Sequence, residues 1–122
     1  MAGNPVGWFE IYVQDMAQAR GFYAQVLGRT LEKLEAGGLE MWAFPRAEGY
    51  GAQGALVRMP GFPSGGNSTI VYFMCEDCGV EESRVVPAGG RVEKEKFSIG
   101  PYGFISLVYD TEGNLFGLHS MK

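Results

Sequence analysis

The sequence has few of the residues that build disulfide frameworks or membrane spans. It contains two cysteines in 122 residues, too few for a fold held together by disulfide bonds. No apolar run approaches the roughly 18 residues that a membrane-spanning helix needs. The N-terminal residues also lack the charged start and apolar stretch of a signal peptide. We therefore expect a cytoplasmic protein that does not enter a membrane.

The sequence also lacks an excess of positive charge. Its formal net charge is -4, and its Lys and Arg residues are scattered rather than clustered. Nucleic acids and anionic membrane surfaces attract basic patches, so we expect neither as a partner. With 46% hydrophobic and 20% charged residues, the composition is typical of a globular domain. The length suits one domain, residues 1–122.

What the sequence does contain is an internal repeat. The segments WFEIYVQDM at residues 8–16 and IVYFMCEDC at residues 70–78 are both apolar strand patterns that end in Asp and an apolar residue. Asp15 and Asp77 are 77 − 15 = 62 residues apart. Further identities at the same offset fall at turns and at the ends of elements, where backbone geometry restricts the residue. The repeat predicts two copies of one structural unit.

Each copy is predicted to be a β-α-β-β-β unit. In the first copy, Asp15 is expected to cap a helix that ends at Gly28, with Gln18 completing a capping box. In the second, Asp77 caps a shorter helix that Pro87 terminates. The expected strands cover residues 7–14, 29–35, 39–44 and 53–58 in the first copy, and 69–75, 91–98, 103–109 and 115–120 in the second.

The expected fold class is α+β, with two tandem modules at about residues 5–59 and 68–122. Each helix would cover one face of its own sheet and leave the other face free. Two such sheets side by side would form an open cup whose inner face is the helix-free one. A ferredoxin-like fold fits less well, because three strands follow each helix.

The run WFEIYVQDMAQARGFYAQVLGRTLEKL at residues 8–34 and the ending YDTEGNLFGLHS at residues 109–120 resemble the glyoxalase/bleomycin-resistance (vicinal oxygen chelate) superfamily. The resemblance is closest to its glyoxalase-related branch, whose members read Gly-Trp-Phe-Glu near the start and Gly-Leu-His-Ser near the end. It covers nearly the whole chain and implies the open-cup fold. It does not imply one activity, because the superfamily includes isomerases, dioxygenases, epimerases, fosfomycin-type resistance enzymes and drug-binding proteins.

The resemblance also implies a divalent metal in the cup, held by His, Gln or Glu side chains from the first and last strands of each module. In this sequence the family pattern and the repeat place those positions at Trp8, Ala55, Ile70 and Gly117. None of these side chains has a lone pair suited to a metal. We therefore expect no metal and no other cofactor. A site displaced to Glu10 and His119 would lack two of its four ligands.

Strand alternation predicts which side chains line the cup. Aromatic and apolar walls with a few polar groups suit a small molecule, although the same aromatics would also pack as a core. Gly117 and Ala55 are expected to leave room where the family has ligands. The predicted lining is Trp8, Glu10, Tyr12, Gln53, Ala55, Val57, Ile70, Tyr72, Met74, Gly117 and His119.

Glu10 and His119 are the candidate catalytic residues of this face. A carboxylate between aromatic side chains loses hydration unless it is paired or hydrogen-bonded, and burial would raise its pKa toward that of a general base. His119 would be its partner or a proton shuttle. The leading hypothesis is a metal-free protein that binds a small molecule, with the acidic residue favouring a cation.

Two other functions are compatible with the same residues. One is a lyase or isomerase related to lactoylglutathione lyase, either metal-free with Glu10 as base or metal-dependent. The other is a partner-binding module whose cup is filled by its own side chains. We expect a homodimer in each case, because the family commonly pairs subunits and open sheet edges favour pairing.

Cys75 and Cys78 form a C-x-x-C motif, which occurs in redox and zinc sites. In the repeat they correspond to Val13 and Met16. The repeat therefore predicts that both thiols lie in the core, on the side that faces the helices.

Overall fold

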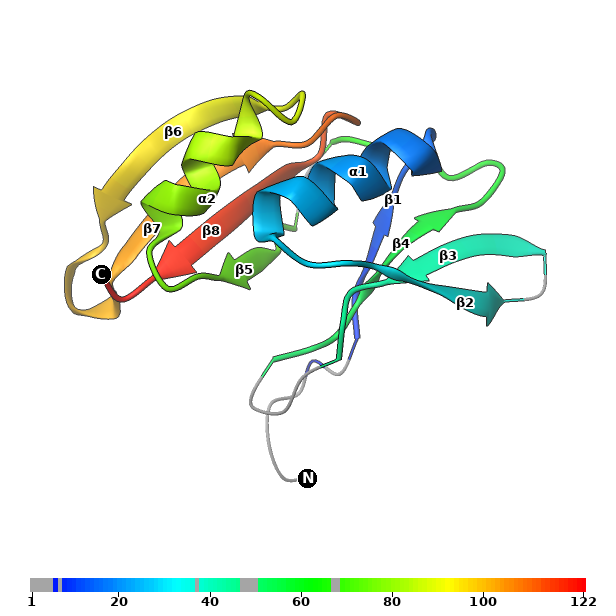
Figure 1. The fold of residues 1–122 in the computed structure, drawn as a ribbon, viewed down its shortest axis with the longest axis horizontal. Helices are drawn as coiled ribbons and strands as arrows, with labels where there is room; N and C mark the ends of the chain where they lie inside the picture. The colour runs from blue at the N-terminus through cyan, green and yellow to red at the C-terminus, as the bar shows by residue number, and fades with distance from the viewer. Residues whose placement is uncertain (1–5, 7, 37, 47–50, 67–68) are drawn as a thin grey trace.

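The computed structural model describes residues 6, 8–36, 38–46, 51–66 and 69–122 as two β-α-β-β-β modules side by side (Figure 1). The α+β class and the repeat are confirmed. The first module consists of β1 (Glu10–Tyr12), α1 (Met16–Leu27), β2 (Glu32–Ala36), β3 (Leu39–Ala43) and β4 (Ala55–Arg58). The second consists of β5 (Tyr72–Met74), α2 (Cys78–Val85), β6 (Arg91–Ser98), the 3-10 turn η1 (Gly100–Tyr102), β7 (Phe104–Tyr109) and β8 (Leu115–Ser120).

Each module forms its own four-stranded sheet, and the two sheets have the same topology. The strand orders are β1-β4-β3-β2 in the first sheet and β5-β8-β7-β6 in the second. In both sheets the first strand runs parallel to the last, with Glu10 opposite Ala55 and Tyr72 opposite Gly117. Glu10 and Tyr72 are 62 positions apart, and so are Ala55 and Gly117. The first residues of α1 and α2 are separated by the same 62 positions. The duplication therefore extends to strand register.

Helix α1 begins and ends where the sequence predicts. The Asp15 carboxylate accepts a hydrogen bond from the Gln18 backbone N–H at 3.1 Å, and Gly28 ends the helix in the left-handed region with φ 66°. The buried face of α1 consists of Met16, Ala19, Phe22, Tyr23 and Val26, while Leu27 is only half-buried. The helix packs against both modules, so a wider stripe of its surface is covered than one sheet would require.

The capping box differs from the prediction. A box closed within the helix would have the Gln18 side chain accept from the backbone N–H of Asp15. In the structure, Glu112 of the second module takes this role: its carboxylate accepts from the backbone N–H groups of Gln14 and Asp15. A residue 97 positions away in sequence thus completes the cap, through a contact that local spacing does not reveal.

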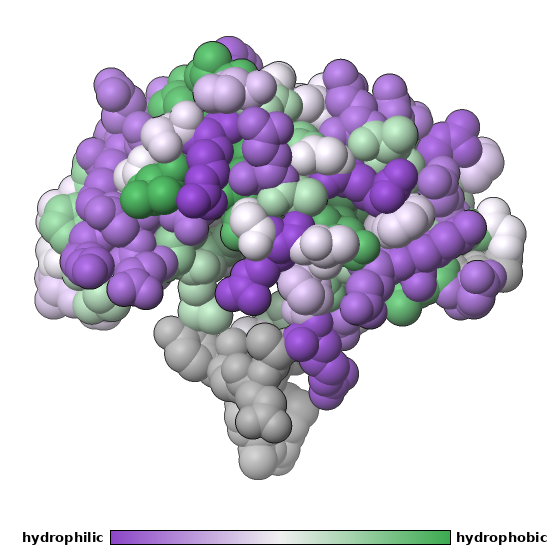
Figure 2. Space-filling model, viewed as in Figure 1, coloured by the Kyte–Doolittle hydropathy of each residue, from purple (hydrophilic) through white to green (hydrophobic). Residues whose placement is uncertain are grey.

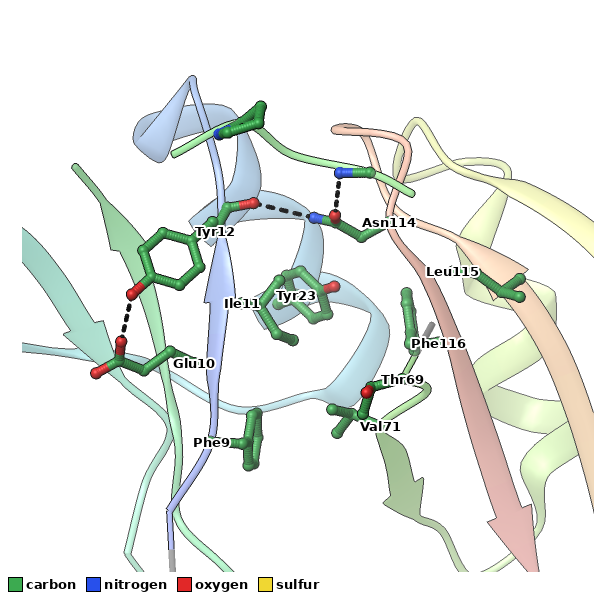
Figure 3. Close-up of a pocket in the computed structure, with 12 residues that line it drawn as sticks. Phe9, Glu10, Ile11, Tyr12, Tyr23, Thr69, Val71, Asn114, Leu115 and Phe116 are labelled. Atoms are coloured by element: carbon green, nitrogen blue, oxygen red, sulfur yellow. Dashed lines mark hydrogen bonds between the residues drawn. The ribbon is translucent and has the colours of Figure 1, made fainter. Parts of the chain in front are cut away.

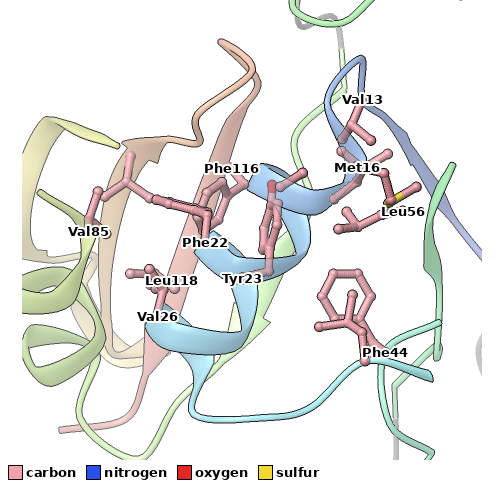
Figure 4. Packing of buried hydrophobic residues seen from close by; sticks show 14 of the residues in the cluster. Val13, Met16, Phe22, Tyr23, Val26, Phe44, Leu56, Val85, Phe116 and Leu118 are labelled. Atoms are coloured by element: carbon pink, nitrogen blue, oxygen red, sulfur yellow. The ribbon is translucent and has the colours of Figure 1, made fainter. Parts of the chain in front are cut away.

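The core lies between the helices and both sheets, and aromatic rings pack within it among aliphatic side chains (Figure 4). Ring centroids of neighbouring aromatic residues are 5.2–6.1 Å apart, mostly in tilted or edge-to-face arrangements. Burying one such side chain stabilises a fold by roughly 1.5–3 kcal/mol, and edge-to-face pairs add to this. The cluster joins the modules, because it consists of Phe9, Phe22, Tyr23 and Phe44 from the first and Phe73 and Phe116 from the second.

A buried carboxylate connects α1 to the last turn of the chain. Asp110 is 4% exposed, and its oxygens accept hydrogen bonds from the Tyr23 hydroxyl at 2.8 Å and from the Asn114 amide at 2.9 Å. The backbone N–H groups of Glu112 and Asn114 donate to it as well, both at 2.8 Å. Four donors offset the cost of burying the charge. Burial, together with the negative charge of Asp110, raises the pKa of Tyr23 well above its usual value of 10.0.

Hydrophilic residues cover much of the face shown in Figure 2, with small hydrophobic areas between them. Within the residues that the structure describes, neither helix is long and apolar enough to cross a membrane.

The Tyr23–Asp110 hydrogen bond predicts a specific loss of stability at alkaline pH. An unfolded Tyr23 ionises near pH 10, whereas the folded protein holds it neutral to higher pH. Its contribution is therefore fully present below about pH 10 and is lost as pH rises further. Tyr23→Phe should lower the free energy of unfolding at pH 7 by about 1–3 kcal/mol and flatten the decline above pH 10. Urea unfolding from pH 7 to 11 measures both effects. Tyr102→Phe, at an exposed position, should change neither.

Candidate functional site

Strand register places the predicted cup residues on the helix-free faces of the two sheets. In the first sheet, Glu10 lies opposite Ala55 and Tyr12 opposite Val57. In the second sheet, Tyr72 lies opposite Gly117 and Met74 opposite His119. Residues that are directly opposite each other in a ladder share a face. The alternate residues Phe9, Ile11 and Val13 point into the core, as the alternation predicts.

On the first sheet, Glu10 is held by two aromatic side chains. The Trp8 indole N–H donates to Glu10 Oε2 at 3.2 Å, and the Tyr12 hydroxyl donates to Oε1 at 2.7 Å. The Tyr12 ring in turn stacks on Phe62, with ring centroids 5.2 Å apart. The Glu10 hydrogen bond, with smaller effects of burial and the carboxylate charge, raises the pKa of Tyr12 above 10.0. We call Trp8, Glu10, Tyr12 and Phe62 the acid–aromatic cluster.

The acid–aromatic cluster lies on the surface and retains the capacity to bind. Glu10 is exposed, and Trp8 is 41% exposed. A carboxylate offers about four lone-pair positions, of which the two aromatic donors use one on each oxygen. The remaining positions and the open ring surface are free to contact a positively charged group.

The rest of the helix-free face of the first sheet is largely closed by its own side chains. Ala43, Ala55 and Val57 are buried, and Tyr12, Leu34, Met41 and Met59 pack over them. Ala55 therefore lies beneath a second, small core rather than in an open cup. Gln53 stands just before β4 and donates its side-chain amide to the Phe44 carbonyl at 2.8 Å.

The helix-free face of the second sheet exposes larger apolar side chains. Tyr72 is 45% exposed and Met74 is 54% exposed. A side chain added to Gly51, in the loop before β4, would contact the Met74 methyl group at 3.4 Å. Met74 thus reaches the first module at the junction of the two sheets. Ile70, two residues before β5, is half-buried.

Gly117 does not leave open space. A Cβ atom at Gly117 would overlap the Tyr72 ring, so the aromatic side chain occupies the position that a larger residue would need. This differs from the expectation that Gly117 adds room to the cup. The sequence pattern that could have predicted this closure is a large residue, Tyr72, opposite a small one, Gly117, in neighbouring strands.

The structure does not join His119 to Glu10. His119 lies on β8, in the second sheet, and its Nε2 is 2.7 Å from the Tyr102 carbonyl. Because a carbonyl only accepts, Nε2 carries the hydrogen in this contact. Glu10 has its hydrogen bonds with Trp8 and Tyr12 in the first sheet. The two predicted catalytic residues thus have separate partners.

The four positions that correspond to the family's metal ligands do not fit a metal. Trp8 uses its only polar atom to donate to Glu10, Ala55 is buried, and Gly117 is covered by Tyr72. Ile70, the fourth, has no donor atom. Throughout the described part of the chain, no three His, Cys, Asp or Glu side chains are grouped to hold an ion.

A cavity of about 220 Å³ lies where the two sheets meet, between β1 and the segment that leads into β5 (Figure 3). Of the eleven predicted lining residues, only Glu10 and Tyr12 contribute to it, and both of these side chains point away from it in Figure 3. Sequence reasoning missed the others because they read as core or linker. They are Phe9, Ile11, Tyr23, Pro63, Gly65, Thr69, Val71, Asn114, Leu115 and Phe116.

Cys75 and Cys78 lie in the core, as the repeat predicts. Cys78 is completely buried and opens α2, while Cys75 is half-buried and packs against the same cluster. Burial, with the negative charge of Glu81 nearby, raises the pKa of Cys75 to about 12. Because the thiolate is the reactive form, this environment disfavours a nucleophilic role for Cys75 at neutral pH.

Comparisons with known proteins agree with the fold. Residues 6–118 match the model of the Glyoxalase/Bleomycin resistance protein/Dioxygenase superfamily. No similar sequence was found among curated proteins. Hypothetical protein SA1046 from S. aureus superposes with a TM-score of 0.74 at 16% identity, covering 98% of this chain and 95% of that one.

Two further structures show the range of proteins that share this fold. TnmS3, an antibiotic binding protein from Streptomyces sp. CB03234, has a TM-score of 0.68 at 24% identity and covers 98% of both chains. An E144Q mutant of glyoxalase I from Zea mays has a TM-score of 0.75 at 19% identity, covering 96% of this chain but 47% of that one. At these identities the similarity establishes the fold alone.

The packing of Tyr72 over Gly117 gives a testable prediction. Gly117→Ala should displace the Tyr72 ring and lower the free energy of unfolding by about 1–3 kcal/mol. Removing the ring should relieve the overlap, so Gly117→Ala should cost less in a Tyr72→Ala background than in the native chain. Chemical unfolding of the four proteins measures this coupling. Strictly additive effects would contradict the packing described here.

Proposed function

The chain belongs to the Glyoxalase/Bleomycin resistance protein/Dioxygenase superfamily, and we propose that it binds a small cationic molecule with an aromatic part. The binding site is the acid–aromatic cluster. One observation carries the proposal: an exposed carboxylate, Glu10, is fixed between the donors of two aromatic residues, Trp8 and Tyr12. A fixed negative charge beside aromatic rings is the arrangement that attracts an organic cation.

The surroundings of Glu10 supply both kinds of interaction that such a ligand needs. The ring stack of Tyr12 on Phe62 fixes one aromatic wall, so little side-chain freedom is lost when a ligand binds. Trp8 offers a partly exposed indole for stacking or for contact with a cation. An antibiotic binding protein among the structural neighbours is consistent with a binding role.

Binding is favoured over catalysis by the state of the two candidate catalytic residues. General acid–base catalysis by this pair needs the two residues within hydrogen-bond reach of each other or of one substrate, whereas the Glu10 carboxylate contacts Trp8 and Tyr12 and not His119. A proton shuttle through His119 would need a path between the sheets, and the His119 ring is instead bonded to the Tyr102 carbonyl. These contacts support a stationary charge that attracts a ligand.

The proposal predicts a dependence on Glu10 that three probes can resolve. Benzyltrimethylammonium should raise the melting temperature and bind in calorimetry. Benzyl alcohol, which lacks the charge, and tetramethylammonium, which lacks the ring, should bind more weakly. Glu10→Gln should reduce the affinity for the aromatic cation at least ten-fold, because it removes the charge but keeps the size of the side chain.

Glu35→Gln is the matched control. Glu35 is exposed on β2 of the same sheet, but its ladder partner Glu40 lies opposite Arg58, on the face that carries α1. The Glu35→Gln variant should bind the aromatic cation with unchanged affinity. Equal loss of affinity in both variants would show a general effect of net charge and would contradict a site at Glu10. The absence of binding by all three probes would also contradict it.

We further propose that two copies pair across their helix-free faces, so that each flanks the other's acid–aromatic cluster. Tyr72 and Met74 expose apolar surface on the second sheet, and a second copy would cover it. Sedimentation at micromolar concentration should show a dimer, and Met74→Glu should yield a monomer. Val86→Glu alters an equally exposed apolar residue at the end of α2 and should leave the dimer intact. A native monomer would refute the pairing.

A further inference from the structure

Arg20 on α1 has a guanidinium that is fixed in position by an aromatic ring. Its Cζ atom lies 3.7 Å from the centre of the Trp42 ring, a stacked cation–π contact with β3. Its Nε atom is buried without a hydrogen-bond partner, and so is the Trp42 indole nitrogen. In the described part of the chain, Arg20 forms no ion pair. A charge held in this way is prepared for an anion that the protein itself does not supply.

A groove of about 320 Å³ runs beside Arg20, between α1 and the segment that enters β2. Its other walls are small or apolar, except for one hydroxyl at Thr30. They are Ala17, Gly21, Ala24, Thr30 and Leu31. The groove lies on the helix-bearing side of the first sheet, away from the acid–aromatic cluster on the helix-free side.

Gly21 gives an independent indication that this groove is kept open. It stands in the middle of α1, where glycine weakens a helix relative to alanine. A Cβ atom at this position would meet nothing within 4 Å, so packing in the folded chain does not require a glycine there. The missing side chain instead widens the groove next to the guanidinium.

Another arginine that stacks on an aromatic ring, Arg91, differs from Arg20 in having a carboxylate partner. Arg91 lies 4.0 Å above the Tyr109 ring, a similar contact in the second sheet. Its Nη1 is paired with the Glu93 carboxylate at 3.4 Å. Arg20 has the stack and a groove in place of the carboxylate.

We propose that the groove beside Arg20 binds a small monocarboxylate with a flat apolar body. The planar guanidinium matches a carboxylate group, Thr30 offers one further donor, and the small walls admit the body of the molecule. The site is separate from the one proposed for cations and does not depend on it. A single positive charge and the apolar walls disfavour a free phosphate.

Trp42 fluorescence tests this in a Trp8→Phe background, where Trp42 is the remaining tryptophan. Titration with benzoate at constant ionic strength should change the emission to saturation. Benzamide, the neutral analogue, and inorganic phosphate should have little effect. Because Trp8→Phe and Glu10→Gln alter the acid–aromatic cluster and not this groove, benzoate should still bind in both, whatever the outcome for cations.

Three variants decide whether the groove is the site. Arg20→Gln should weaken benzoate at least ten-fold, and Gly21→Leu should abolish binding by filling the groove without lowering the melting temperature. Arg91→Gln, the matched control, should leave binding unchanged. The proposal is overturned if benzoate gives no saturable change, if benzamide or phosphate binds as well as benzoate, or if Arg20→Gln or Gly21→Leu binds normally.

Discussion

The turn between β7 and β8 connects the two modules, and the arrangement of the rest of the structure depends on it. Asp110 gathers four hydrogen bonds in a buried position, one of them from Tyr23 on the helix of the other module. Glu112 caps the start of that helix, and the Asn114 amide reaches the Tyr12 carbonyl at 3.2 Å. One short turn thus holds β1, α1 and the second sheet together, and the burial of the Asp110 carboxylate makes its own hydrogen bonds costly to break.

The helix-free faces show how a fold can keep its shape without the groups that define its best-known chemistry. Tyr72 fills the space above Gly117, and a small apolar core covers Ala55. At both positions the chain's own side chains occupy the space. This side also carries the exposed Glu10 with its two aromatic donors, which offers a negative charge beside ring surfaces.

Stacked cations occur in both modules, but on different faces of their sheets. In the second sheet, Arg91 lies over Tyr109 of β7 on the helix-free face and also has a carboxylate partner, while Lys94 lies over Phe97 within β6. In the first sheet, Arg20 stacks on Trp42 on the helix-bearing face, and within the described residues it forms no ion pair. Duplication therefore preserved the backbone plan while the side chains on its surfaces diverged.

Most of the fold was predictable because its determinants are local or periodic. Asp15 and Asp77 begin helices through side-chain hydrogen bonds to nearby backbone N–H groups, and Gly28 ends one through its left-handed backbone. Strand alternation assigns Glu10 and Ile11 to opposite faces. The 62-residue repeat extended this reading to strand register. For the candidate site, the sequence predicted only which face of each sheet it occupies. Whether a residue on this face is open, covered or hydrogen-bonded depends on rings such as Tyr72 and Phe62, whose positions come from packing.

The sequence by itself determined the two modules, their helices and the lack of suitable metal ligands at the family positions, because these follow from short-range geometry and donor chemistry. Only the tertiary structure decided that Glu112 caps α1, that Tyr72 closes over Gly117 and that Arg20 stacks on Trp42, because each contact arises where segments distant in the chain meet.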